Sequence, residues 1–378
     1  MTIAIMAESR PGERRVGLVP GAARHYLKRG WDVRVEAGAG VGASFPDAEY
    51  EAAGVTVVTD RQALLEGAQV VLKVQPPSLE EVGALAPGTQ LVCQLNPLGP
   101  TEVIEALAER GITSFAVELI PRITRAQKMD VLSSQATVAG YKAVLLGASA
   151  MTRFLPMLTT AAGTVRPAKA LILGAGVAGL QAIATARRLG AVVSAFDIRP
   201  AVKEQVESLG AKFLEATLEE SSEDEGGYAR ELSEEQHQRE LELIADNIRD
   251  HDLVITTAQI PGKPAPVLIT EEMVGAMRPG SAIVDLASES GGNCEVTVAG
   301  QSVDHGGVAV MGPTNLPAEL PFHASQMYSS NLASFVNDLF DGEGAIDFDE
   351  EVTAATLVTH GGEITNDRVR AKLASATE

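Results

Sequence analysis

Residues 171–197 read LILGAGVAGLQAIATARRLGAVVSAFD, in which a short apolar run leads directly into three closely spaced glycines. Gly174, Gly176 and Gly179 have the spacing G-x-G-x-x-G, and an alanine-rich segment of helical pattern follows them. In such a unit the first glycine allows a tight turn, the second lets backbone N–H groups approach a pyrophosphate, and the third lets helix and strand pack closely. The pyrophosphate then lies at the positive end of the helix. The stretch therefore predicts a strand, a turn and a helix that bind a dinucleotide.

An acidic residue completes the same unit. Asp197 ends a second apolar run, 18 residues after Gly179, where a carboxylate can accept hydrogen bonds from an adenosine ribose. Its negative charge would repel a 2′-phosphate, so we expect the pocket to favour NAD over NADP. A glycine-rich turn that binds nothing would not explain the whole order of strand, turn, helix, strand and acid. A membrane span is excluded because the uncharged residues 170–186 are too few for a bilayer and include three glycines.

Composition and charge limit the remaining possibilities. A chain of 378 residues is long enough for two domains, each with a full core. The net charge of −20, from 30 basic and 50 acidic residues, argues against a nucleic-acid or anionic-membrane surface. Cys93 and Cys294 are isolated, so we expect two buried thiols rather than a disulfide or a zinc site. The opening MTIAIMAESR is typical of a short strand rather than a signal peptide, which favours a soluble, cytoplasmic chain.

Short apolar runs alternate with amphipathic segments along residues 3–117 and again along 168–310. This alternation predicts an α/β fold with two Rossmann-like, doubly wound parallel-sheet domains separated by a cleft, where a cofactor is expected to bind. Helical patterns at 133–150 and 322–340 are long enough to carry the chain from the first domain to the second and back. The expected domains are residues 1–135 plus 325–378, and 136–324.

Residues 221–235, SSEDEGGYARELSEE, form a long acidic segment with one aromatic residue, Tyr228. A solvated loop explains this composition. A lid whose tyrosine folds over a bound nucleotide explains it equally well, because the aromatic residue lies beside two glycines in a dinucleotide-binding domain. Both interpretations stay open.

Further segments carry a family resemblance. Residues 8–20, ESRPGERRVGLVP, and 36–45, EAGAGVGASF, resemble N-terminal motifs of the alanine dehydrogenase and nicotinamide nucleotide transhydrogenase superfamily. Residues 121–135, PRITRAQKMDVLSSQ, together with 260–266 (IPGKPAP) and 291–294 (GGNC), resemble more narrowly the NAD(H)-binding soluble alpha subunit, or domain I, of the proton-translocating transhydrogenase. The resemblance covers essentially the whole chain.

The resemblance implies a Re/Si-specific NAD(P)⁺ transhydrogenase that is active only with partner subunits. It implies a homodimer that holds NAD(H), a beta subunit that holds NADP(H), and a membrane-spanning subunit through which hydride transfer is coupled to proton translocation. The chain would then be peripheral on the inner (plasma) membrane. The residues implied in positioning the nicotinamide are Arg122, Gln127, Asp130 and Ser133, with Gln127 reaching toward the partner nucleotide. The residues implied in binding NAD, besides the three glycines and Asp197, are Val177, Ile198, Arg199, Gly227, Tyr228, Ala258 and Gln259.

The residue types at 122–133 agree with this chemistry. Arg122, Gln127 and Asp130 supply donors and acceptors that can fix an amide and a ribose, but none is a poised general base. Hydride transfer between two nicotinamides moves no proton at the reacting carbons, so the protein has only to orient the rings and exclude water. Taken without the resemblance, the same residues favour an ordinary ion pair between Arg122 and Asp130 at a helix start, with Ser133 as the N-cap.

An NAD-dependent, alanine dehydrogenase-like amino-acid dehydrogenase is the alternative. Arg15 and Lys73 lie where alanine dehydrogenases hold the substrate carboxylate and carbonyl. Such enzymes also need a histidine to handle a substrate proton, and the matching position here is Asn96. We therefore interpret Arg15 and Lys73 as structural residues, for example in surface ion pairs. A non-catalytic NAD sensor would need only the glycine motif and would leave the 122–133 segment unexplained.

Overall fold

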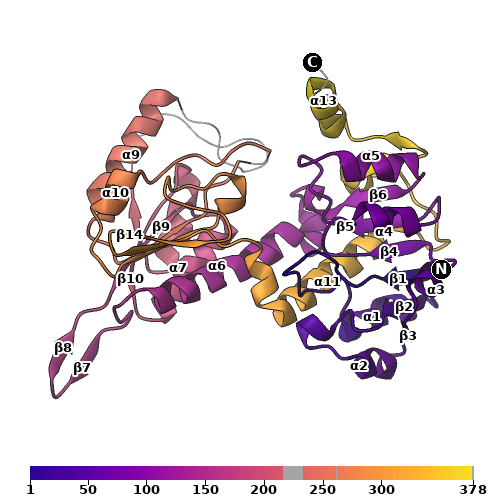
Figure 1. Cartoon of the computed structure of the whole chain (residues 1–378), viewed down its shortest axis with the longest axis horizontal. Coiled ribbons are helices and arrows are strands. Elements are labelled where there is room, and N and C mark those ends of the chain that lie inside the picture. Colours follow the sequence, from indigo (N-terminus) through magenta and orange to yellow (C-terminus); the bar gives the residue numbers. More distant parts are fainter. Residues whose placement is uncertain (216–232, 261, 377–378) are drawn as a thin grey trace. The chain divides into compact units, whose positions relative to one another are not determined.

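The computed structural model describes residues 1–215, 233–260 and 262–376, and it consists of two compact units (Figure 1). The first unit is Met1–Gln135 with Pro317–Glu378, and the second is Ala136–Leu316. The long helix α6 (Val131–Ala150) contains the first crossing between them. Each unit has its own sheet and its own core, as predicted for a two-domain α/β protein.

The second crossing lies eight residues before the expected boundary at residue 324, because the second unit ends at Leu316. The reason is the helix α11 (Pro321–Leu339), which packs on the first unit from its first turn. In its first turn Phe322 stacks on Phe45, and in the next turn the Ser325 hydroxyl accepts the backbone N–H of Val16 at 3.1 Å. The whole helix therefore belongs to the first unit.

The first unit is an eight-stranded sheet in the order β17-β16-β6-β5-β4-β1-β2-β3, in which only β16 among the described strands runs antiparallel to the others. Alternate residues of β1 and of the position just after it enter two different core clusters, Ile3 and Ile5 in one and Ala4 and Met6 in the other. Both faces of the sheet are therefore covered, as a doubly wound sheet requires. The strands are β1 (Thr2–Ile5), β2 (Asp32–Glu36), β3 (Thr56–Val58), β4 (Val70–Leu72), β5 (Gln90–Cys93), β6 (Thr113–Ala116), β16 (Leu357–His360) and β17 (Glu363–Ile364). The helices besides α11 are α1 (Pro20–Leu27), α2 (Asp47–Ala52), α3 (Arg61–Leu65), α4 (Leu79–Ala84), α5 (Glu102–Glu109), α12 (Glu351–Thr356) and α13 (Asp367–Ala376).

The second unit is a seven-stranded sheet in the order β11-β10-β9-β12-β13-β15-β14, of which only β14 is antiparallel among the described strands. The chain runs outward from β9 through β10 to β11 and then returns to pair β12 with the other edge of β9. This reversal is a topological switch point, where ligands of open α/β sheets bind at the carboxyl ends of the strands. The strands are β9 (Lys169–Leu173), β10 (Val192–Phe196), β11 (Lys212–Leu214), β12 (Leu253–Thr256), β13 (Ala282–Asp285), β14 (Ser302–His305) and β15 (Val308–Met311). The helices besides α6 are α7 (Val177–Arg188), α8 (Lys203–Ser208), α9 (Glu234–Ile248) and α10 (Glu271–Gly275).

A separate two-stranded hairpin, β7 (Leu158–Thr160) with β8 (Gly163–Val165), projects from the second unit (Figure 1). All of its residues are exposed. Elsewhere the expected thiols, Cys93 and Cys294, are buried and not in disulfides. Within the described ranges, no helix combines the length and apolar character needed to cross a bilayer, and no three potential metal ligands gather.

Glycines allow α6 and α7 to approach closely within the second unit. A Cβ on Gly140 of α6 would lie 2.1 Å from the carbonyl oxygen of Ala178 in the first turn of α7. That carbonyl is backbone, so it can move only if a helix moves. Further along α6, Ala143 and Val144 enter the same core cluster as β9 and β12.

We expect Gly140→Ala to lower the free energy of unfolding by about 2 kcal/mol or more, because the added methyl forces two packed helices apart. Gly83 on α4 is the matched control, since a Cβ there meets no atom within 4 Å. Gly83→Ala should be neutral or stabilising by about 0.5–1 kcal/mol. Chemical denaturation followed by circular dichroism measures both variants. Equal, small effects at the two positions would contradict a tight α6–α7 contact.

Candidate nucleotide-binding site

Each position of the G-x-G-x-x-G turn favours glycine for a different geometric reason. Gly174 has φ +93°, and a Cβ there would lie 2.5 Å from the Thr257 hydroxyl oxygen. A Cβ on Gly179 would lie 1.9 Å from the carbonyl oxygen of Gly174, so strand and helix meet through backbone alone. At Gly176 the nearest atom lies 4.0 Å away, which leaves the backbone open to a ligand. The turn thus has the geometry that pyrophosphate binding requires.

The first turn of α7 supplies the electrostatic part of the site. Gly176 occupies its N-cap position, and no side chain in the described part of the chain caps it. The N–H groups of this turn therefore point, with the positive end of the helix dipole, toward the space beyond the carboxyl end of β9. An anion such as a pyrophosphate is stabilised there.

Asp197 joins the end of β10 to the glycine turn. Its Oδ2 accepts the backbone N–H of Ala175 at 2.7 Å, and its Oδ1 accepts the backbone N–H of Arg199 at 2.9 Å. The Arg199 side chain folds back on the same carboxylate, donating from Nε at 2.9 Å and from Nη2 at 2.8 Å. The neighbouring Ile198 is half-buried against the core. The acid predicted to bind a ribose is thus already held firmly in place.

The segment after β12 forms the other side of this edge. The Thr257 hydroxyl donates to the carbonyl of Gly174 at 3.1 Å. The Asn293 side chain accepts the Ala258 N–H at 3.0 Å and donates to the Ala258 carbonyl at 2.9 Å. Gln259 donates to the carbonyl of Leu286 at 3.0 Å. Sequence reasoning placed Ala258 and Gln259 here but missed the role of Asn293, a fully buried amide that fixes their backbone.

A second residue that the sequence did not reveal is Asp285, at the carboxyl end of β13 and fully buried. Its two oxygens accept five hydrogen bonds, from three backbone N–H groups and two hydroxyls. One of these donors is the N–H of Asn293, at 2.7 Å. Asp285 therefore holds Asn293, and Asn293 holds Ala258. The donors are Thr256, Ala287, Asn293, Cys294 and Thr297.

The four residues assigned to the nicotinamide lie within residues 122–133 of the first unit, a segment that contains η3 (Thr124–Met129) and the start of α6. Arg122 and Gln127 are exposed. Asp130 accepts the backbone N–H of Ser133 at 2.8 Å and the hydroxyl of Ser133 at 2.6 Å. Asp130 is therefore the N-cap of α6, and the expectation that Ser133 caps the helix is wrong. The side chain that accepts the free N–H comes from the residue before the helix.

The remaining two predicted nucleotide-binding residues, Gly227 and Tyr228, lie outside the residues that the structure describes. The glycines, Val177, Asp197, Arg199 and Ala258 all belong to one edge of the second sheet.

Arg15 and Lys73 are buried, and the expectation of surface ion pairs is wrong. Arg15 binds Glu13 at 2.7 Å, where the exposed fractions of the two side chains are 3% and 0%. The Lys73 ammonium lies 3.4 Å from Glu81 and 3.6 Å from Glu8, all of them buried. Both cations are therefore neutralised by carboxylates of the first unit itself. The sequence did not reveal this burial, because it depends on residues of other elements, such as Gln135 of α6 beside Arg15 and Glu81 of α4 beside Lys73.

Asn96 also has an acidic partner that the sequence did not indicate. Its backbone has φ +50°, and its N–H donates to Glu118 in η2 (Val117–Leu119) at 2.6 Å. Burial raises the pKa of Glu118 to about 7. Its second carboxyl oxygen is buried and has no hydrogen-bond partner among the described residues. A group that titrates near neutral pH thus lies beside the position where the alternative function needs a histidine.

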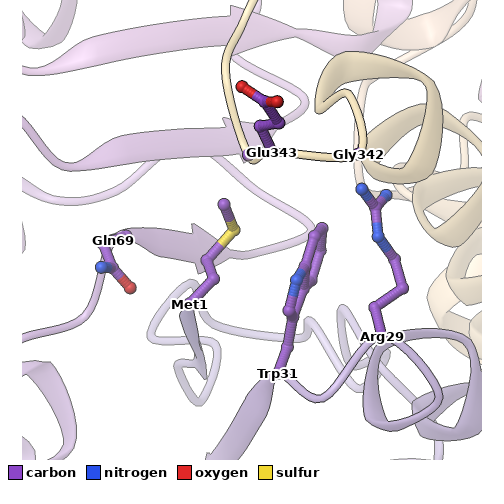
Figure 2. Close-up of a pocket in the computed structure, with 7 residues that line it drawn as sticks. Met1, Arg29, Trp31, Gln69, Gly342 and Glu343 are labelled. Atoms are coloured by element: carbon purple, nitrogen blue, oxygen red, sulfur yellow. The ribbon is translucent and has the colours of Figure 1, made fainter.

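A cavity of about 310 Å³ in the first unit is not the nucleotide site (Figure 2). Met1, Trp31 and Gln69 line it, and each directly precedes a parallel strand. It therefore lies at the amino ends of β1, β2 and β4, whereas doubly wound sheets bind ligands at the carboxyl ends. Figure 2 shows Arg29 beside Trp31, with the guanidinium 4.2 Å from the indole centroid.

Comparison with known proteins identifies the family. The N-terminal domain of "Alanine dehydrogenase/PNT" matches residues 4–139, and the C-terminal domain of the same family matches residues 143–367. The chain belongs to the alanine dehydrogenase/PNT family. An NAD(P) transhydrogenase alpha-subunit chain of Rhodospirillum rubrum is 48% identical over 374 residues, covering 96% of this chain and 97% of that protein.

Solved structures agree with this assignment to the alanine dehydrogenase/PNT family. A transhydrogenase from Sinorhizobium meliloti has a TM-score of 0.88 and 48% identity, covering 96% of this chain and all of that one. An L-alanine dehydrogenase has a TM-score of 0.82 and 26% identity, covering 99% of both chains. The predicted family and the predicted two-domain, Rossmann-like fold are confirmed. Membership of this pyridine-nucleotide family also supports NAD(H) binding.

We expect Asp285→Asn to lower the free energy of unfolding by about 3 kcal/mol, because the amide group cannot accept all five hydrogen bonds and leaves buried donors unpaired. Asp246 on α9 is the matched control, because it is an exposed aspartate that is not part of such a network. Asp246→Asn should alter the free energy of unfolding by less than about 0.5 kcal/mol. Chemical denaturation measures both. A mild effect of Asp285→Asn would mean that the network does not organise this edge of the sheet.

Proposed function

We propose that the chain is the NAD(H)-binding component of a proton-translocating transhydrogenase of the Re/Si-specific type. Hydride passes directly between NADH on this chain and NADP⁺ on a partner subunit, and membrane subunits couple the transfer to proton translocation. The observation that carries the proposal is the 48% identity to a transhydrogenase alpha subunit along nearly the full length of both chains. The alanine dehydrogenase of Bacillus subtilis, by contrast, is 29% identical over 379 residues.

NAD(H) is proposed to bind at the carboxyl edge of the second sheet. The first turn of α7, with Gly174, Gly176, Val177 and Gly179, holds the pyrophosphate, and the open backbone at Gly176 fits this role. Bound NADH supplies the hydride from its nicotinamide ring. The side chains at the adenosine end are Asp197, Ile198 and Arg199, with Ala258 and Gln259 at its edge.

The segment from η3 to α6 is proposed to orient the nicotinamide. Arg122, Asp130 and Ser133 hold the carboxamide and its surroundings, while Gln127 reaches toward the partner's nucleotide. The Asp130–Ser133 hydrogen bonds fix the end of this segment, which supports a positioning role. Since the hydride moves without a proton, these residues act by orientation and by excluding water.

The chain is proposed to act as a homodimer with an NADP(H)-binding beta subunit and a membrane-spanning subunit, on the cytoplasmic side of the membrane. The projecting β7–β8 hairpin and the apolar side chains near it fit a second copy of the chain (Figure 1). Phe154 is 59% exposed, and Met157 is 64% exposed. Exposed apolar side chains that gather in one region are typical of an interface.

An alanine dehydrogenase-like activity is the second candidate, and Glu118 is the observation that favours it, because its pKa of about 7 suits proton transfer. The buried ion pairs of the first unit argue against this activity. Arg15 and Lys73 are already paired with internal carboxylates, which a substrate carboxylate would have to displace.

We expect the chain mixed with an NADP(H)-binding transhydrogenase component to transfer hydride from NADPH to an NAD analogue, and each protein alone to be inactive. Absorbance of the reduced analogue measures the transfer. A parallel reaction contains the chain alone, NAD and alanine. NAD reduction there, without any partner, would replace the proposed function with the dehydrogenase.

Gln127→Asn should slow hydride transfer by about tenfold to 100-fold, because a shorter amide misplaces the reacting rings. Binding of NADH, measured by calorimetry, should stay within about twofold, since the phosphate and ribose contacts lie on another unit. Gln238→Asn on α9 is the matched control, an exposed glutamine with the same chemical change, and should leave both quantities unaltered. A large loss of NADH binding with normal transfer from the bound nucleotide would contradict the role of Gln127.

A further inference from the structure

The segment that carries Gln127 is a short 3₁₀ helix, η3, with an exposed and a buried side. Gln127 and Lys128 are exposed. The residues that flank them, Ala126 and Met129, are buried in the same core cluster as Leu332 of α11. Hydrogen bonds within a 3₁₀ helix have poor geometry, so a helix of this kind is not rigid by itself. The position of Gln127 therefore depends on how η3 is held against α11.

The apolar contacts and the ion pairs of η3 do not fix its orientation. Hydrophobic burial has no preferred direction. Arg125 of η3 pairs with Asp338 of α11 and with Glu350, the N-cap of α12, but these side chains are 44%, 35% and 29% exposed. Exposed ion pairs contribute little to stability and are screened by salt. A directional contact in a buried place is needed to hold η3 in one orientation.

Asn331 of α11 makes such a contact. Its side chain is buried, and its Nδ2 donates to the backbone carbonyl of Lys128 at 2.8 Å. A hydrogen bond of this length requires good alignment of donor and acceptor, so it fixes the direction of that carbonyl. Lys128 directly follows Gln127. The bond therefore fixes the backbone from which the Gln127 side chain projects.

The other end of the Asn331 amide has no partner. Its Oδ1 is buried and accepts no hydrogen bond among the residues that the structure describes. A buried acceptor without a partner costs free energy, which a leucine of similar size would avoid. Leucine is also the better helix former. The packing of α11 alone would thus favour leucine at position 331, and the bond from Nδ2 to Lys128 is what the asparagine adds.

We propose that Asn331 is a positioning residue for hydride transfer, which holds η3 so that Gln127 lies in its working orientation. Asn331 acts through Gln127 and not on a nucleotide. The inference rests on the role of Gln127 in the proposed transhydrogenase reaction. A small displacement of groups that orient the reactants lowers the rate of the chemical step steeply. The effect of losing this bond therefore falls on transfer and not on the binding of NADH to the second unit.

Hydride transfer from NADPH to an NAD analogue, by the full chain mixed with an NADP(H)-binding transhydrogenase component, tests this proposal. We expect N331L to lower kcat about tenfold. The Kd for NADH, measured by calorimetry, should stay within about twofold of the parent value. N337L is the matched control, because Asn337 is also on α11 but its Oδ1 accepts a hydrogen bond from Arg29, at 3.3 Å. It should leave both quantities unaltered.

A double-mutant cycle separates positioning of Gln127 from a general structural role. If Asn331 acts through Gln127, adding N331L to Q127N should lower kcat by about twofold or less beyond Q127N alone. The same tenfold loss in both backgrounds would overturn the proposal. A loss of NADH affinity as large as the loss of kcat would overturn it as well.

N331A is the second variant, should N331L fold poorly. It removes the donor and the unpaired acceptor together, and alanine is the best helix former. We expect the same loss of kcat, with N337A as its control. A parent chain that is inactive with the NADP(H)-binding component would contradict the proposed function itself. An active parent chain, with N331L and N331A equally active, would overturn only the role of Asn331.

Discussion

The contact between Gly174 and Gly179 is the constraint on which the second unit depends. A Cβ at Gly179 would lie 1.9 Å from the Gly174 carbonyl oxygen, so the turn after β9 can close onto α7 only through bare backbone. One residue before Gly179, the carbonyl of Ala178 lies where a Cβ of Gly140 on α6 would clash, at 2.1 Å. The end of β9, the helix α7 and the crossing helix α6 therefore approach one another here through backbone rather than side chains. This close approach fixes the direction of α7, and with it the place where an anion is stabilised.

Around this backbone contact, buried acids and amides fix the irregular segments at the carboxyl edge of the sheet. Asp285 accepts five hydrogen bonds, one of them from the backbone of Asn293. The Asn293 side chain in turn binds the backbone of Ala258 and so fixes its position. Asp197 does the same for the glycine turn through Ala175. Loops carry backbone groups that no ladder satisfies, and a carboxylate can satisfy several at once. Burying each carboxylate costs free energy. That cost is offset because the carboxylate accepts hydrogen bonds from buried donors that would otherwise have no partner.

The sequence was most informative where function depends on local spacing. The glycine turn and Asp197 lie within 24 residues of one another, and their order predicted the unit that the structure contains. Asp285, Asn293 and Glu118 acquire their roles from partners on other elements, so no local pattern revealed them. Arg15 was expected at the surface because its burial depends on Gln135 of α6, 120 residues away, as well as on the nearby Glu13. The sequence pattern assigned the N-cap of α6 to Ser133 instead of Asp130, because the capping residue can be identified only once the first residue of the helix is known.

The internal ion pairs of the first unit bear on which chemistry the fold performs. Reactions of an amino acid need a cation that is free to hold the substrate carboxylate and a group that handles a proton. Here Glu13 holds Arg15, and Glu8 and Glu81 flank Lys73, so a substrate would have to break buried pairs whose remaining charges would then be unpaired. A transfer of hydride between two nicotinamides needs neither group. The same scaffold can therefore serve that transfer with its cations satisfied internally, and what it must then control is which nucleotide each site accepts.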